Sequence, residues 1–399
     1  METVQGGVTA PMGFSAFGIF CGIKRRGKDM ALLVSDRPAA VAGMLTTNRL
    51  SAPCVDWVRT VLKKGRAQAI VANSGNANCC TGRQGHQDCG MMARWVAERL
   101  QIPQKEVLVA STGVIGQFLP MQKVRSGIQL AVRRLSRTGS ISAAEAIMTT
   151  DTRPKEIAIR FTVGRSLVTV GGIAKGSGMI SPHMATMLAF LTTDARIQSG
   201  SLRRALQLFV PESFNAMTVD GAMSTNDMVL FLANGASGCH TLQEGTEGYR
   251  KFLKAVEKVC STLAHEIVRD GEGVTRLFTV QVTGASNSLE AMRVARQVAN
   301  CVLVKTMVAG RDPNWGRIAA AVGASGIPIR PRQLTLRLGK VTVFQGGEPV
   351  KVPRPMLLQQ VDHPEVRIEI KLGRGTSQAR LLSGDLTEDY VRINAKYTT

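Results

Sequence analysis

Short apolar runs, each bounded by Gly, Asn or Asp, recur through the first half of the chain. Runs of this kind are typical of buried β-strands, and we place strands at residues 31–35, 69–72, 107–110 and 168–170. Farther along, three apolar residues alternate with polar neighbours and predict a half-buried strand, at Phe278, Val280 and Val282.

Three longer segments carry apolar residues at helical spacing. They predict helices over residues 85–100, 250–268 and 288–308, and Gly310 is a suitable C-terminal cap for the third. Strands and helices joined by short turns indicate a mixed architecture, α/β or α+β. A chain of 399 residues has room for two or three compact units.

Composition narrows the class of protein. Hydrophobic residues make up 44% of the chain and aromatic residues only 5%, so we expect an aliphatic core. Residues 3–23 are uncharged, but Gly and Pro interrupt them, which argues against a signal peptide and a membrane span. Eight cysteines in a long chain without a secretory segment favour free thiols. We therefore expect a cytoplasmic protein.

One cluster suggests a metal site. Cys79, Cys80, His86 and Cys89 lie close together in the sequence. Structural zinc sites, however, usually contain Cys pairs separated by two to four residues. This spacing does not match such a site, so we expect buried or surface thiols and no metal.

The net charge is +21, from 50 basic and 29 acidic residues. Such an excess raises the possibility of a nucleic-acid-binding protein. The basic residues, however, are scattered in ones to threes, as at Lys24-Arg-Arg26 and Lys63-Lys64. The sequence contains no long basic run, zinc finger or aromatic RNA-binding block. We therefore expect a dispersed surface charge and no nucleic-acid partner.

The most informative stretch is Lys175-Gly-Ser-Gly-Met-Ile-Ser-Pro-His-Met-Ala-Thr-Met-Leu188. A threonine hydroxyl becomes a good nucleophile if the peptide bond before it is cut, because the free α-amine then acts as its base. Ala185, a small residue, precedes Thr186, and an apolar run follows. The pattern also fits a glycine loop that leads into a buried strand. Lys175 could in addition hold pyridoxal phosphate, which nothing else in the sequence supports.

The same stretch resembles the ornithine acetyltransferase (glutamate N-acetyltransferase) family of arginine biosynthesis. Other family-like blocks follow in the family's order and span nearly the whole chain. They are Asn73-Ser-Gly-Asn-Ala-Asn78, Ser111-Thr-Gly-Val-Ile-Gly116, Thr149-Thr-Asp-Thr-Arg-Pro-Lys155, Ser213-Phe-Asn215, Val219-Asp-Gly221, Ser224-Thr-Asn-Asp227, Asp270-Gly-Glu-Gly273, Asp312-Pro-Asn-Trp-Gly-Arg317 and Asn394-Ala-Lys-Tyr-Thr-Thr399.

The resemblance implies a fold and a processing event. The expected fold is a layered α/β/β/α core with a smaller C-terminal α/β domain from about residue 285. Self-cleavage between Ala185 and Thr186 would give an alpha chain, residues 1–185, and a beta chain, residues 186–399. The tail of the beta chain would return to the site, and two alpha and two beta chains would assemble into a heterotetramer.

The resemblance also assigns a site. Thr186 is the expected nucleophile, and the Thr112 hydroxyl and the Gly113 N–H are the expected oxyanion donors. The expected substrate-binding residues are Thr152, Lys175, Thr186, Glu272, Asn394 and Thr399. In this interpretation Lys175 holds a substrate carboxylate and Glu272 meets an amino group. Taken alone, these segments would be ordinary turns and a frayed tail.

Two positions depart from the family pattern, His183 in place of an asparagine and Ala222 in place of an acidic residue. The first puts the efficiency of self-cleavage in doubt, and the second removes a carboxylate with no assigned role. The nucleophile is intact.

The resemblance finally implies an activity. Acetyl would move from N-acetylornithine to Thr186 and then to glutamate, a double displacement that requires no metal or bound cofactor. Some family members also accept acetyl-CoA as donor. The rival within the superfamily is an aminopeptidase or amidohydrolase, in which water accepts the acyl group. The rival from another class is the nucleic-acid-binding protein suggested by charge alone.

Overall fold

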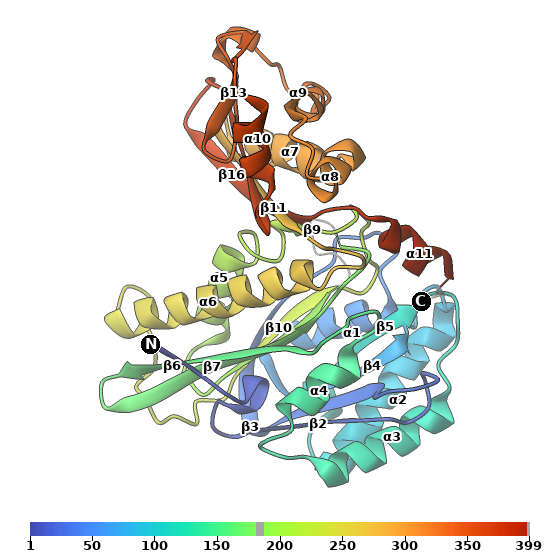
Figure 1. The fold of residues 1–399 in the computed structure, drawn as a ribbon. Helices are drawn as coiled ribbons and strands as arrows, with labels where there is room; N and C mark the ends of the chain where they lie inside the picture. The colour runs from blue at the N-terminus through green and yellow to red at the C-terminus, as the bar shows by residue number, and fades with distance from the viewer. Residues whose placement is uncertain (181–186, 397–399) are drawn as a thin grey trace.

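The computed structural model describes residues 1–180 and 187–396. The chain forms a large core and a smaller unit that stands on one end of it (Figure 1). The last helix, α11 (Glu388–Lys396), leads back from the smaller unit to the core (Figure 1). Four residues named above, His183, Ala185, Thr186 and Thr399, lie outside the described residues.

A nine-stranded mixed sheet organises the core. Its order is β1-β6-β7-β8-β10-β3-β4-β5, with β2 paired to β3. The pairs β8–β10 and β4–β5 are parallel, and the other pairs are antiparallel. The strands are β1 (Glu2–Val4), β2 (Phe14–Ile19), β3 (Met30–Leu45), β4 (Arg66–Asn76), β5 (Val107–Val114), β6 (Lys155–Val163), β7 (Ser166–Lys175), β8 (Leu188–Thr193) and β10 (Met228–Ala233).

Strand β3 belongs to two parts of this sheet. Its residues 30–35 lie between β2 and β4, whereas residues 40–45 pair with β10. The register with β4 shifts between Val34 and Ala39, and such an irregularity bends a strand. The two β layers expected for the core are therefore parts of one sheet, and β3 runs through both.

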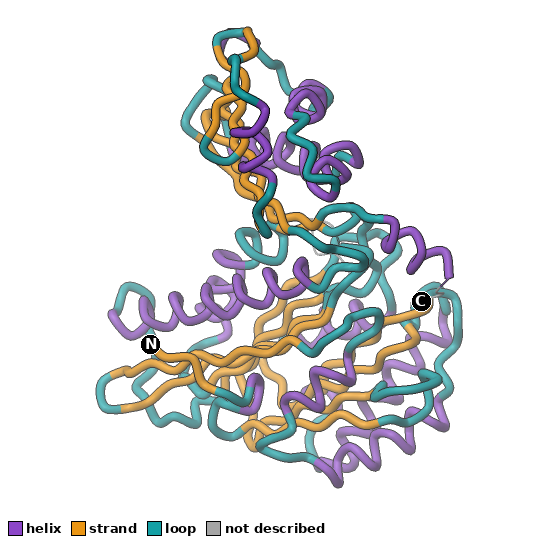
Figure 2. Tube along the Cα trace, in the orientation of Figure 1, coloured by secondary structure: helices purple, strands orange, loops and turns teal. Residues whose placement is uncertain are grey.

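Helices cover the core sheet on both sides (Figure 2). Leu188 and Phe190 of β8 belong to one hydrophobic cluster, with α1–α4, whereas Ala189 and Leu191 belong to another, with α5 and α6. Because successive strand residues point to opposite faces, β8 is buried on both sides. The helices are α1 (Pro53–Leu62), α2 (Gly82–Leu100), α3 (Met121–Arg134), α4 (Ser140–Ile147), α5 (Ser199–Phe209) and α6 (Glu247–Arg269), with short 3-10 turns η1 (Gly7–Thr9) and η2 (Gln104–Glu106).

The smaller unit has its own sheet and its own hydrophobic cluster. The strand order is β14-β13-β12-β15-β11-β16-β9, and β9 (Met217–Thr218) comes from the middle of the chain. The other strands are β11 (Leu277–Ala285), β12 (Thr335–Leu338), β13 (Val341–Gln345), β14 (Glu348–Pro349), β15 (Glu365–Lys371) and β16 (Ser377–Gly384). The helices are α7 (Ser288–Ala299), α8 (Val302–Ala309), α9 (Trp315–Gly323) and α10 (Arg354–Val361), with the 3-10 turn η3 (Pro331–Gln333).

The mixed α/β class predicted from the sequence is confirmed, and each predicted strand lies within a strand of the structure. The predicted helices over 85–100 and 250–268 correspond to α2 and α6. The single helix expected over 288–308 is wrong, because α7 ends before Asn300 and α8 starts after Cys301. Cys301 is extended, and the Asn300 side chain accepts a hydrogen bond from the Thr218 hydroxyl at 2.7 Å. A tertiary contact therefore accompanies the break.

Candidate active site

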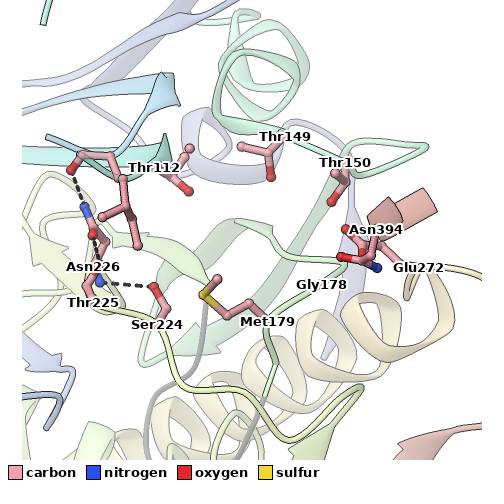
Figure 3. A pocket seen from close by; sticks show the side chains of 13 residues that line it. Thr112, Thr149, Thr150, Gly178, Met179, Ser224, Thr225, Asn226, Glu272 and Asn394 are labelled. Carbon is pink, nitrogen blue, oxygen red and sulfur yellow. Dashed lines mark hydrogen bonds between the residues drawn. The ribbon is translucent and has the colours of Figure 1, made fainter. Parts of the chain in front are cut away.

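A small cavity that is partly open to solvent lies where several of the sequence blocks meet. Figure 3 shows polar side chains facing it from opposite sides. The lining residues come from parts of the sequence before and after segment 181–186, and one of them lies in the C-terminal helix α11. The lining residues are Ala77, Thr112, Gly113, Ile115, Thr149, Thr150, Gly178, Met179, Ser224, Thr225, Asn226, Glu272 and Asn394.

Two of the predicted site residues are in direct contact. Thr112 lies in β5 and Lys175 is the last residue of β7, and both are buried. Lys175 Nζ donates a hydrogen bond to Thr112 Oγ1 at 3.2 Å. Because the hydroxyl oxygen accepts this bond, the hydroxyl proton is left to donate elsewhere. Thr112 can therefore offer a donor to the cavity that it lines.

Lys175 is a lysine held in the interior of the core. Burial is the strongest influence on its pKa and lowers it, whereas Asp151 and Asp227 act in the opposite direction. Its side chain is 1% exposed, so a bound carboxylate would interact with it through little water. A lysine ammonium in this setting is a suitable partner for a substrate carboxylate.

Gly113 has a backbone conformation that suits glycine. Its φ is 132°, and a Cβ atom at this position would overlap the carbonyl carbon of Gly75 in the neighbouring strand β4. The close approach of two strands therefore leaves no room for a side chain beside the proposed oxyanion donor.

We expect Gly113→Ala to destabilise the fold by about 2 kcal/mol or more, because it adds a steric clash to an unfavourable φ. Gly116→Ala is a matched control, since Gly116 also has a positive φ, 82°, but a methyl group added to it would meet no atom within 4 Å. Thermal unfolding of both variants measures the difference. Equal midpoints would show that the contact with Gly75 does not constrain residue 113.

Glu272 and Asn394 meet at the cavity. Asn394 Nδ2 donates to Glu272 Oε2 at 2.7 Å, and the two side chains lie together in Figure 3. Glu272 N donates to Ser177 O at 2.9 Å, so the acidic residue is tied to the segment after β7. A Cβ atom at Gly178 would collide with the Glu272 carboxylate, so glycine at this position makes room for the acid. The C-terminal helix thus reaches the same cavity as the glycine-rich segment.

Thr152 occupies a different position from these residues. Its hydroxyl and its backbone N–H both donate to the carboxylate of Asp270. Lys155 Nζ bridges Asp270 at 2.6 Å and Asp151 at 2.7 Å, and all three of these charged groups are buried. Through Asp270, Thr152 is therefore connected to a network of buried ion pairs beside the cavity.

The network also reaches Lys175. Burial would raise the pKa of Asp151, but the charges of Lys155 and Lys175 and a hydrogen bond from Gly176 N–H lower it to about 2. A carboxylate that stays ionised across the physiological range provides a fixed negative charge next to the buried lysines.

The described residues on either side of segment 181–186 are firmly held. Asp220 accepts hydrogen bonds from the N–H groups of Met179 and Ile180, and Asp227 Oδ1 accepts one from Met187 N at 2.8 Å. Ala222, the departure from the family pattern, is exposed and donates its own N–H to Asp220 at 3.0 Å. That bond uses the backbone and does not depend on the side chain at position 222.

Several cavity residues had no assigned role in the sequence analysis. They are Thr149, Thr150, Ser224, Thr225 and Asn226, and all belong to blocks that carried the resemblance. Asn226 shows why such a block matters, because its amide donates to Ala77 O at 2.7 Å and to Ser111 O at 2.8 Å. This residue joins three separate blocks at the cavity wall. The only signal in the sequence that could have identified these cavity residues was their position within the family-like blocks.

The cysteine cluster has the features of free thiols. Cys79 and Cys80 have sulfur atoms 3.9 Å apart, and Cys89 Sγ accepts a hydrogen bond from Asn78. All eight cysteines are free. Within residues 1–180 and 187–396, no group of three or more His, Cys, Asp or Glu side chains is arranged to hold a metal ion. Over the same residues, no helix combines the length and the apolar character that crossing a bilayer requires.

Comparison with known proteins identifies the family. The model of the ArgJ family matches residues 15–399. The arginine biosynthesis bifunctional protein ArgJ of Symbiobacterium thermophilum is 48% identical, with complete coverage of both chains, and that of Oceanobacillus iheyensis is 45% identical, covering 99% of this chain and 97% of the relative. Ornithine acetyltransferase of Mycobacterium tuberculosis, solved in complex with ornithine, is 40% identical over 45% of this chain and 97% of that chain, with a TM-score of 0.42. The chain therefore belongs to the ArgJ family.

Proposed function

We propose that this protein is a self-processing acetyltransferase of arginine biosynthesis, which moves acetyl from N-acetylornithine to glutamate through Thr186. Its similarity over the full chain to arginine biosynthesis bifunctional proteins supports this activity. The observation that carries the chemistry is the Lys175–Thr112 hydrogen bond, which leaves a hydroxyl donor at a cavity also lined by Gly113 and Glu272. Acyl transfer needs such donors where charge develops on the carbonyl oxygen.

Self-cleavage would prepare the nucleophile. Thr186 Oγ attacks the carbonyl carbon of Ala185, the peptide C–N bond breaks, and the hydroxyl proton goes to the nitrogen. The resulting ester is hydrolysed by water, which gives a carboxylate at Ala185 and restores the hydroxyl of Thr186. The products are a free α-amine and a free hydroxyl on one residue, the combination that an N-terminal threonine nucleophile requires.

Acetyl transfer would then proceed in two halves. The amine takes the hydroxyl proton while Oγ attacks the acetyl carbon of N-acetylornithine, and ornithine leaves with that proton on its nitrogen. The amino group of glutamate next attacks the acetyl ester, the ester C–O bond breaks, and a proton from the attacking nitrogen passes through the Thr186 amine to Oγ, which releases N-acetylglutamate. Thr112 and Gly113 would stabilise the oxyanion in both halves. Lys175 would hold a substrate carboxylate, and Glu272, supported by Asn394, would meet an amino group.

Two further residues would contribute to the site. Thr152 would contribute through its contact with Asp270, and Thr399 would complete the substrate site. We propose that the reaction uses no bound cofactor and that acetyl-CoA can serve as a second donor. We also propose a cytoplasmic heterotetramer of two alpha and two beta chains, with a smaller domain from about residue 285.

Glutamate should be required for repeated turnover. With N-acetylornithine alone, we expect one equivalent of ornithine per site at most, because the acetyl ester must be protected from water until an acceptor binds. Glutamate should then start continuous release with parallel-line, ping-pong kinetics. A rapid-quench assay of ornithine, with and without glutamate, measures both phases.

Aspartate, one methylene shorter, is the matched control acceptor. It should restart release far more weakly if the site was selected for glutamate. Hydrolysis of N-acetylornithine that runs equally fast without any acceptor would identify the protein as an amidohydrolase and contradict the transferase.

A further inference from the structure

Thr149 and Thr150 line the cavity but have no role in the reaction proposed above. Both lie in the segment that leads from α4 to β6, and both are half-buried. In Figure 3 they lie between Thr112 and the pair formed by Glu272 and Asn394. Neither hydroxyl has a hydrogen-bond partner in the part of the chain that the structure describes. Each of them can therefore donate to an anion bound in the cavity.

The two substrates of the proposed reaction carry opposite charges at the ends of their side chains. N-acetylornithine is acetylated on its α-nitrogen, so its free amino group is at the end of its side chain, and Glu272 is the proposed partner of that group. Glutamate has a carboxylate in the corresponding place. In a cavity that is only partly open to solvent, two carboxylates repel each other. If Lys175 holds the α-carboxylate of either substrate, the side-chain carboxylate of glutamate needs a partner other than Glu272.

The backbone before β6 fixes the position of the two threonines. Thr149 N donates to Asp151 Oδ2 at 3.0 Å. The Asp151 side chain is fully buried, and its Oδ1 accepts hydrogen bonds from Lys155 Nζ and Gly176 N, both at 2.7 Å. This carboxylate is therefore neutralised by its own partners, and it does not line the cavity. The segment is held from behind, and its two hydroxyls are left for a ligand.

A lysine lies behind the same segment. Lys24 Nζ donates to Met148 O at 3.1 Å, and Met148 directly precedes Thr149. Burial is the strongest influence on the pKa of Lys24 and lowers it, whereas the charges of Asp29 and Asp151 act to raise it. In its protonated form, Lys24 makes the electrostatic potential at this part of the wall more positive, which favours an anion beside the hydroxyls.

We infer that Thr149 and Thr150 form the subsite for the side-chain carboxylate of glutamate. Their hydroxyls donate to its oxygens, whereas Glu272 and Asn394 serve the side-chain amino group of N-acetylornithine. The two substrates thus share the partner of their α-carboxylates and have different partners at the ends of their side chains. The inference rests on the proposed function, since it needs glutamate as the acceptor.

The test compares two acceptors on Thr149→Val and Thr150→Val, because valine keeps the shape of threonine without its hydroxyl. Glutamine is the control acceptor, since it has the shape of glutamate without the charge. A hydrogen bond to a charged group contributes more than one to a neutral group, so in each variant we expect kcat/KM for glutamate to fall roughly 10- to 100-fold and the preference for glutamate over glutamine to fall roughly tenfold.

The donor half of the reaction is measured on the same proteins. The burst of ornithine from N-acetylornithine alone, in protein that has been allowed to cut fully, should be slowed far less than transfer to glutamate. Thr149→Ser and Thr150→Ser keep the hydroxyl and should keep the preference for glutamate. Thr162→Val is a matched control, since Thr162 is exposed in β6, and it should behave like the wild type in both halves.

An unchanged preference for glutamate over glutamine in both valine variants would overturn the inference. An equal loss for the two acceptors would overturn it as well, because a general change in packing slows both alike. If a valine variant gives no burst of ornithine, the acceptors are compared on the alanine variant of the same residue. Wild-type protein that transfers no acetyl to glutamate would contradict the proposed function itself, whereas the first two outcomes leave that function intact and remove only the subsite.

Discussion

Thr186→Ala should remain a single chain of 399 residues on a denaturing gel, whereas the wild-type protein should separate into residues 1–185 and 186–399. Alanine has no hydroxyl, so it can neither attack the Ala185 carbonyl nor carry an acetyl group. Loss of a covalent nucleophile costs roughly 10⁶-fold in kcat where it has been measured, and we expect a loss of that order in acetyl transfer. N-terminal sequencing of the lower wild-type fragment should read Thr-Met-Leu-Ala.

Two variants control for this result. Thr186→Ser keeps both a hydroxyl and a future amine, so it should still cut itself and transfer acetyl. Thr193→Ala removes a buried hydroxyl at the end of β8, one that donates to Thr169 O at 2.7 Å, and it should be processed like the wild type. A fully active wild-type protein that stays uncut would contradict the mechanism.

The elements that could be predicted from the sequence are those whose burial follows a local period. Helix α6 presents one apolar face, so a helix over residues 250–268 was readable, whereas its first turn from Glu247, capped by the Thr246 side chain, was not predicted. The break between α7 and α8 was not readable, since the hydrophobic period continues across it. The structure shows that Asn300 bonds to Thr218, which is 82 residues away. A contact of that kind leaves no trace in the local pattern.

The candidate site was likewise predictable only in part from the sequence. The sequence blocks identified Thr112, Gly113, Glu272 and Asn394, and the structure gathers these four around one cavity. No spacing in the chain could show that Lys175 donates to Thr112, because the two residues meet only through the folded sheet.

The acidic partners were hidden for another reason. Asp151, Asp227 and Asp270 are buried, and single aspartates in turn-like segments usually indicate turns. Their interior position becomes visible only once β7, β8 and β10 are assembled side by side. What distinguishes Asp227 from an ordinary turn residue is therefore its place in the sheet.

The role of Thr112 depends on which atom of its hydroxyl is free. Since Lys175 Nζ donates to Oγ1, the hydroxyl proton can be directed at a developing oxyanion. The adjacent hydroxyl, Ser111, is turned elsewhere and donates to Asn73 Oδ1 at 2.7 Å. The two neighbours thus differ in direction and in partner, which makes Ser111 a matched control for Thr112.

Thr112→Ala should reduce the rate of acetyl transfer by roughly 10²–10³-fold, the usual effect of losing one oxyanion donor. It should slow self-cleavage as well, because that step passes through a similar tetrahedral intermediate. Thr112→Ser restores a hydroxyl at the same position and should recover most of the rate, and Ser111→Ala should keep it. Single-turnover release of ornithine from protein that has been allowed to cut fully separates transfer from processing. Near-normal release by Thr112→Ala would remove this hydroxyl from the oxyanion site and leave Gly113 N–H as its remaining proposed donor.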